Sequence, residues 1–178
     1  MTDSEVQRSP TETLAYSLVG DRLHLVEREI ERACNSEIGL VRRHSEYVLR
    51  AGGKRLRPAM VLLCTNICGY KGDDDVELGA VIEFIHTATL VHDDILDGAE
   101  VRRGQEAANQ VWGNKLAVLL GDYIYMRSLA MSVGLGSLRL VEILTEATSR
   151  LLEGEILDVS NNGNVESTDN DYLETIDR

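Results

Sequence analysis

The sequence predicts an all-α fold, a bundle of packed helices, and three observations support this prediction. Apolar residues recur at helical spacing along most of the 178 residues. Only two prolines, Pro10 and Pro58, interrupt the chain. No segment shows the alternating pattern of a half-buried strand. A chain of this length is expected to form one domain, so we predict a loose tail over 1–10 and a single helical domain over 11–178.

The first two helices are predicted from their apolar spacing and their end signals. Leucine, valine and isoleucine side chains recur at helical spacing from Thr11 to about residue 30. Ser36 offers an N-cap for a second helix that continues to about Leu49. Gly52 and Gly53 then end it.

A third helix is predicted to begin at Pro58 and to end at Gly69, because proline suits the first helical position. The fourth, over about 75–97, is apolar on nearly every side at its centre, which indicates burial among other helices. Glycine and charged residues then predict a loop over 98–113.

The rest of the chain predicts two long helices, a polar connector and the start of another helix. These segments are about 114–132, about 137–159, 160–170 and 172–178, in that order.

Composition excludes several classes of function. The net charge is −12 and the isoelectric point near 4.7, so the surface repels phosphate backbones at long range. Aromatic residues make up only 4%, which leaves few platforms for stacking bases. No run of apolar residues reaches the about 18 to 20 that a membrane span needs, and the first residues are polar and acidic, unlike a secretory signal. We expect no nucleic acid partner, no membrane span and a cytoplasmic location.

Three cysteines, Cys34, Cys64 and Cys68, cannot all pair within one chain. Cys64 and Cys68 are four residues apart on an apolar helix, which is a common core spacing rather than a zinc or redox motif. We expect all three to be buried, reduced thiols.

Two aspartates at the end of the fourth predicted helix suggest a metal site. Asp93 and Asp97 are four apart, so both carboxylates project from one face at the negative end of the helix. Like charges at this spacing destabilise a helix, whereas Mg²⁺ favours one or two protein carboxylates together with substrate phosphates. Asp94 lies farther round the helix and is expected to support the pair. On these residues alone, a solvated helix end remains the alternative.

Cationic side chains favour the metal and phosphate interpretation. Eight of the 18 lysines and arginines fall in two short segments, namely Arg42, Arg43, Arg50, Lys54, Arg55 and Arg57 in one and Arg102 and Arg103 in the other. Lys54 and Arg57 occupy a glycine turn that leads into a helix N-terminus, a setting that binds anions. His86 lies seven residues before Asp93 on the same face and is able to donate to a phosphate oxygen, although a lone histidine on an apolar helix is more often a packed core residue.

Taken together, these residues resemble the trans-polyprenyl diphosphate synthases, most closely the long-chain, octaprenyl-type synthases of bacteria. Four stretches match in order and spacing: GGKRLRP (52–58), IEFIHTATLVHDDILD (82–97), VRRG (101–104) and WGNKLAVLLGDYIY (112–125). The resemblance covers the whole chain after its tail. It implies an isoprenoid-synthase-type bundle around a central cavity, here truncated after about six helices.

The resemblance also implies a role for each site residue. Asp93 and Asp97 are then the catalytic metal ligands, holding Mg²⁺ on an allylic diphosphate, and Arg102 holds the same diphosphate. Isopentenyl diphosphate is held by the remaining site residues, Lys54, Arg57, His86 and Arg103. The implied reaction ionises the allylic C–O bond, joins the isopentenyl double bond to the carbocation and releases a proton. Metal and arginine neutralise the leaving diphosphate, so no nucleophilic side chain is required.

In this family the side chains just below the first aspartate motif set the product length. The fifth and fourth residues before Asp93 are the small Ala88 and Thr89. We therefore expect a long-chain polyprenyl product of about eight isoprene units, since small side chains leave a deep apolar tunnel.

The sequence also departs from the family pattern. Glu106 and Ala107 replace the more usual Pro-Thr, a minor difference. Neither the Lys-Thr pair nor the second aspartate-rich motif that normally follow is present, so the chain resembles the first half of a synthase. We expect the 178-residue chain to be inactive alone, to expose apolar helix faces and to form a homodimer as the family does. The alternatives are a non-catalytic partner subunit of a complete synthase and a helical terpene cyclase. The segment GGKRLRP (52–58) argues against the cyclase, because a cyclase binds one diphosphate and needs no second phosphate-binding segment.

Overall fold

The computed structural model describes residues 10–51 and 53–178, and the chain divides into two compact units at residues 135 and 136. The tail predicted over 1–10 lies outside the described residues except for Pro10, and so does Gly52. The first unit contains α1 (Pro10–Ala33), α2 (Gly39–Arg50), α3 (Leu56–Ile67), α4 (Asp74–Leu96), β1 (Val101–Arg102), β2 (Gln105–Glu106), α5 (Ala108–Trp112) and α6 (Asn114–Gly134). The second contains α7 (Leu138–Asn161) and α8 (Asp169–Ile176). The predicted helical fold is confirmed.

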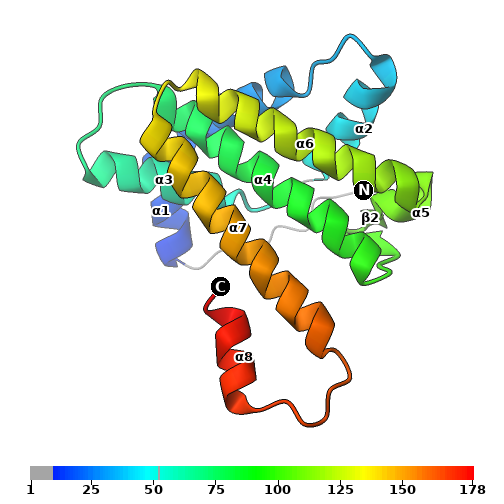
Figure 1. Ribbon diagram of the computed structural model, residues 1–178. Helices are drawn as coiled ribbons and strands as arrows, with labels where there is room; N and C mark the ends of the chain where they lie inside the picture. Colours follow the sequence, from blue (N-terminus) through cyan, green and yellow to red (C-terminus); the bar gives the residue numbers. More distant parts are fainter. Residues whose placement is uncertain (1–9, 52) are drawn as a thin grey trace. The chain divides into compact units, whose positions relative to one another are not determined.

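Helix α4 is the centre of the first unit. It packs against α1, α3 and α6, and Figure 1 shows α4 and α6 side by side in opposite directions. Its buried side chains include Val81, Phe84 and Ala88, each at most 2% exposed. Gly121 of α6 allows a close approach, because a Cβ atom there would lie 2.3 Å from Nε2 of His92. The predicted burial of this helix is therefore confirmed.

Two helix starts differ from the prediction. Helix α2 begins at Gly39, and the Ser36 hydroxyl accepts from the Ile38 backbone N–H instead of capping the helix. Helix α3 begins at Leu56, two residues before Pro58. Pro58 still occupies the first helical turn, where its missing N–H has no intrahelical partner to lose.

The segment predicted as a loop over 98–113 contains a short β-hairpin and helix α5. Val101 pairs with Glu106 and Arg102 with Gln105. The two residues between the strands, Arg103 and Gly104, both have positive φ, at 51° and 79°. This geometry is that of a type I′ turn, which two-residue hairpins favour because its twist matches the strands. Strands of two residues are too short to produce a readable alternation in sequence.

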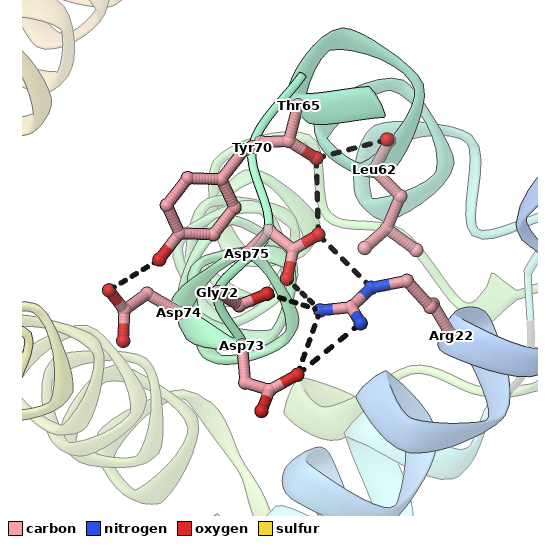
Figure 2. A network of polar contacts seen from close by, with 8 residues as sticks. All are labelled: Arg22, Leu62, Thr65, Tyr70, Gly72, Asp73, Asp74 and Asp75. Atoms are coloured by element: carbon pink, nitrogen blue, oxygen red, sulfur yellow. Dashed lines mark hydrogen bonds and ion pairs between the residues drawn. The ribbon is translucent and has the colours of Figure 1, made fainter. Parts of the chain in front are cut away.

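A polar network ties α1 to the start of α4 (Figure 2). The Arg22 guanidinium donates to both carboxylate oxygens of Asp75, to Asp73 and to the Gly72 carbonyl. Thr65 of α3 donates to the same Asp75 carboxylate at 3.1 Å. The Asp75 side chain is only 4% exposed, so its charge depends on these partners.

Helix α6 has the length and composition of a helix that could cross a membrane. The same composition is found in core helices of soluble proteins, and α6 buries Ala117, Leu120 and Ile124 while carrying Asp122 and Arg127.

The second unit is a pair of helices with well-defined caps. Ser137 accepts from the Leu140 backbone N–H at the start of α7, and Thr168 and Asp171 form a capping box at the start of α8. Gly154 lets the helices approach, because a Cβ atom there would lie 3.0 Å from the Thr175 carbonyl oxygen.

The prediction of three buried cysteines is wrong for two of them. Cys34 is buried, whereas Cys64 and Cys68 are exposed, and all three are free thiols. Cys64 lies on α3 and Cys68 directly follows its last residue, but α3 turns other residues, among them Ala59 and Leu62, towards the core.

We predict that Arg22→Ala lowers the free energy of unfolding by about 2 to 3 kcal/mol, because it removes the charged partner of the buried Asp75 carboxylate and leaves it the Thr65 hydroxyl. Denaturant titration followed by circular dichroism measures this change. Arg139→Ala is the matched control, since Arg139 forms an exposed pair with Glu142 and such pairs contribute little. Equal effects of the two substitutions would contradict the assigned role of Arg22.

We also predict that a thiol reagent at about pH 8 labels two of the three cysteines in the folded chain. Burial raises the pKa of the Cys34 thiol to about 11, so this thiol stays protonated and shielded. Peptide mapping should find label on Cys64 and Cys68, and on Cys34 only after denaturation. Fast labelling of Cys34 in the native chain would contradict its placement.

Candidate diphosphate and metal site

The aspartate pair lies where α4 ends, and backbone bonds fix this end. The Asp97 N–H donates to the Asp93 carbonyl at 2.8 Å, and the Ala99 N–H donates to the Asp94 carbonyl at 2.9 Å. Gly98 has a φ of 64°, the left-handed conformation that commonly ends a helix. Asp93 and Asp97 are therefore held one turn apart, as predicted.

The charges of the two aspartates oppose each other. Burial raises the pKa of Asp93 above its ordinary value, and the neighbouring charge of Asp97 raises it further. A divalent cation would relieve this repulsion, and hard carboxylate oxygens suit Mg²⁺. Within residues 10–51 and 53–178, no group of three or more potential protein ligands comes together. Two carboxylates would need oxygen ligands from phosphate and water to complete the coordination of a Mg²⁺ ion.

Asp94 points to another side of α4 and pairs with the hairpin. Arg102 donates to Asp94 Oδ1 through Nε, at 2.7 Å, and through Nη2. The Asp94 side chain is 4% exposed and that of Arg102 is 36% exposed. Asp94 therefore orients Arg102, whose charge acts on Asp93 and Asp97. This places the predicted phosphate ligand Arg102 beside the aspartate pair.

Arg103, in the turn of the hairpin, lies next to Gly53 in the loop before α3. A Cβ atom on Gly53 would lie 2.7 Å from Nη1 of Arg103, so only glycine leaves room for this guanidinium. Burial lowers the pKa of Arg103, and the positive charges of Arg55, Arg102 and Arg57 lower it further. Cationic side chains from two distant segments therefore gather here.

His86 shares this electrostatic environment. Burial lowers its pKa below the ordinary value, and the nearby charges of Arg57, Arg103 and Arg102 act in the same direction. His86 is half-buried and neutral near pH 7 as a result. His86 thus lies within electrostatic range of three other predicted phosphate ligands, which are Arg57, Arg102 and Arg103.

Lys54, the fifth predicted phosphate ligand, precedes α3 with an exposed side chain, and its backbone carbonyl accepts from the Tyr16 hydroxyl. Arg57 is also exposed, in the first turn of α3. Both side chains therefore remain accessible to an anion at the helix N-terminus.

A small pocket of about 30 Å³ lies beside the hairpin. Its walls include Val48, Leu90 and Val91, and Asp94 and Arg102 also line it. Its lining is mainly apolar, so it borders the charged site rather than forming it.

Two residues at this site had no role assigned from the sequence. The Asn109 side-chain amide donates to the carbonyls of Asp94 and Ala99, at 3.0 and 3.1 Å, and so holds the end of α4. Arg55, counted from sequence only among the cations, is turned inward between Glu27 and Glu83. An acidic residue, Glu83, in the apolar central part of α4 was the available signal, because a buried carboxylate requires a partner.

Comparison with known proteins shows one family along most of the chain. The polyprenyl synthetase family model matches residues 39–178. Octaprenyl diphosphate synthase of Escherichia coli is 40% identical over 151 residues, which are 85% of this chain and 47% of that protein. Heptaprenyl diphosphate synthase component 2 of Geobacillus stearothermophilus is 36% identical over 163 residues, covering 92% of this chain and 51% of that protein.

A solved structure agrees with both the fold and the family. The crystal structure of a polyprenyl synthase from Caulobacter crescentus, complexed with calcium and isoprenyl diphosphate, superposes with a TM-score of 0.89 at 35% identity. The match covers 96% of this chain and 52% of that one. The chain spans about half the length of the curated relatives it matches. On this evidence, the chain belongs to the polyprenyl synthetase family.

Proposed function

We propose that this chain provides the substrate-binding half of a trans-prenyltransferase that condenses isopentenyl diphosphate with an allylic diphosphate. The observation that carries the proposal is the meeting of two charge sets in one unit. Asp93 and Asp97 end α4 beside Arg102, whose charge acts on both. Arg102 belongs to a cationic group with Arg57 and Arg103, whose charges all act on the His86 imidazole. Two diphosphates and a divalent cation complement such an arrangement.

Asp93 and Asp97 would hold Mg²⁺, and the bound ion would supply neutralisation of the charge that develops on the leaving diphosphate. Arg102 would bind the allylic diphosphate, since Asp94 orients its guanidinium beside the aspartates. Because these charges are fixed before reaction, they stabilise the departing anion without further reorganisation.

Lys54, Arg57, His86 and Arg103 would hold isopentenyl diphosphate. Arginine offers a fork that matches two phosphate oxygens, lysine a movable charge and neutral imidazole one N–H donor. The position of Lys54 and Arg57 at the start of α3 adds the positive end of a helix dipole. They would place the isopentenyl double bond towards the allylic carbon.

A long product, of about eight isoprene units, is part of the proposal. Two of the relatives are named for octaprenyl and heptaprenyl diphosphate. Ala88 and Thr89 are small residues below the aspartate pair, and Thr89 shares the helix face of Asp93. A small side chain on this face leaves depth for an apolar chain.

We further propose a cytoplasmic homodimer. Leu119, Met126 and Val133 recur every seven residues along α6 and are 64%, 59% and 65% exposed. An apolar stripe of this kind on a helix fits a second copy of the chain. A second candidate function is that of a non-catalytic partner subunit. The name of the Geobacillus relative, heptaprenyl diphosphate synthase component 2, favours this candidate because it implies a second component.

We predict that the printed chain binds an unreactive allylic diphosphate analogue in a Mg²⁺-dependent manner but forms no product. Asp93→Asn together with Asp97→Asn should abolish the effect of Mg²⁺, because the metal ligands are lost. Titration calorimetry measures binding, and radiolabelled isopentenyl diphosphate measures turnover. Asp122→Asn is the control, since Asp122 is an exposed aspartate on α6. Binding that is insensitive to Mg²⁺ would contradict the metal site, and turnover by the printed chain would contradict the proposed inactivity.

For a catalytically active protein that carries this chain, we predict that Ala88→Tyr shortens the product, because an aromatic ring would close the apolar path. Product chromatography measures the length. Ala88 is 2% exposed, so Thr89→Phe, at a half-buried position, serves as a second variant that needs less repacking. If the protein without substitutions made a product of only three or four isoprene units, the long-chain proposal would be contradicted.

A further inference from the structure

Arg55 lies between two proposed phosphate ligands, Lys54 and Arg57, yet it is directed away from them. The Lys54 and Arg57 side chains are exposed, whereas the Arg55 side chain is only 9% exposed. A long cationic side chain in a loop normally reaches into water, so its burial requires specific partners.

Partners from three helices surround the Arg55 guanidinium. It donates to both carboxylate oxygens of Glu27 on α1, at 2.6 and 3.2 Å. It also donates to Glu83 Oε1 on α4 at 2.7 Å and to the Leu49 carbonyl of α2 at 3.0 Å. The planar fork of arginine satisfies these directions at once, which lysine is unable to do.

The backbone of Arg55 is held in a costly conformation. Its φ is 49° and its ψ is 37°, the left-handed region that non-glycine residues rarely adopt. Its carbonyl accepts from the Ala59 N–H at 3.0 Å, the bond that opens α3. The side-chain bonds therefore secure the backbone reversal that precedes Arg57 in the first turn of the helix.

Glu83 connects this cluster with the rest of the site. It lies three residues before His86 on α4, and its side chain is 3% exposed. Its charge also acts on Arg103 of the hairpin. With Arg55 counted as +1 and the two glutamates as −1 each, the cluster carries a net charge of −1, so the cluster as a whole does not attract an anion.

We propose that Arg55 is a positioning residue, which anchors the turn through Glu27, Glu83 and Leu49 so that Lys54 and Arg57 are presented to a diphosphate. This inference rests on the proposed function, in which Lys54 and Arg57 bind the diphosphate. Arg55 itself is assigned no contact with the diphosphate. It distinguishes three neighbouring cationic residues by role, with two as ligands and one as their anchor.

The most discriminating variant is Glu27→Gln. Glu27 is 42% exposed at its side chain, so the substitution is tolerable for folding. Removal of a negative charge near an anion site strengthens anion binding if only charge matters. Loss of the anchor weakens binding, so the sign of the change separates the two explanations.

Titration calorimetry of the printed chain with isopentenyl diphosphate measures this sign. We expect the affinity to fall about tenfold in Glu27→Gln, as for other residues that orient ligands indirectly, and about as much in Arg55→Lys. Glu31→Gln is the control, because Glu31 is a 60%-exposed carboxylate on the same helix, 3.7 Å from Arg50. It should leave the affinity unchanged. Denaturant unfolding of each variant verifies that the titrated protein is folded.

Unchanged or tighter binding by folded Glu27→Gln overturns the positioning role and leaves the proposed function standing. Absence of binding by the unmodified chain overturns the isopentenyl diphosphate site and this inference together. Loss of folding in Arg55→Lys does not affect the test, because Glu27→Gln alone decides it.

Discussion

The need to pair buried carboxylates governs the arrangement of the first unit. Helix α4 carries three of them, Asp75, Glu83 and Asp94, and each is bound by an arginine from a different segment. Arg22 reaches its start from α1, Arg55 its middle from the turn before α3, and Arg102 its end from the hairpin. An unpaired charge in the interior is strongly unfavourable, so each pair fixes one segment against the helix.

These three arginine–carboxylate pairs hold the fold together, and other charged side chains are left to bind ligands. Asp93 and Asp97 form none of these three pairs, and their mutual repulsion is one that a divalent cation relieves. On the cationic side, Arg55 is neutralised by two glutamates, while burial and the charges of Arg57 and Arg103 lower the pKa of His86. An acidic protein can thereby present a local anion site. The polyprenyl synthetase family provides the chemical context in which such a site binds diphosphates.

The sequence predicted most helices because long amphipathic segments carry their own periodicity, as in α4 and α6. It predicted the spacing of Asp93 and Asp97 for the same reason. It did not predict the hairpin, because two-residue strands leave no pattern, nor the exposure of Cys64 and Cys68, because spacing identifies a shared face but not the direction in which that face points. The inward turn of Arg55 was also missed, since it depends on Glu27 and Glu83, which are each 28 residues away in sequence.

The central claim is that the aspartate pair and the cationic group form one site for metal and diphosphate. A crystal structure of the chain with Mn²⁺ and an unreactive allylic diphosphate analogue tests it most directly, because Mn²⁺ can be located by anomalous scattering. The account predicts Mn²⁺ bonded to carboxylate oxygens of Asp93 and Asp97 and to the diphosphate, with Arg102 donating to the same diphosphate. Mn²⁺ on other acidic residues, or a diphosphate without contact to Arg102, would contradict it.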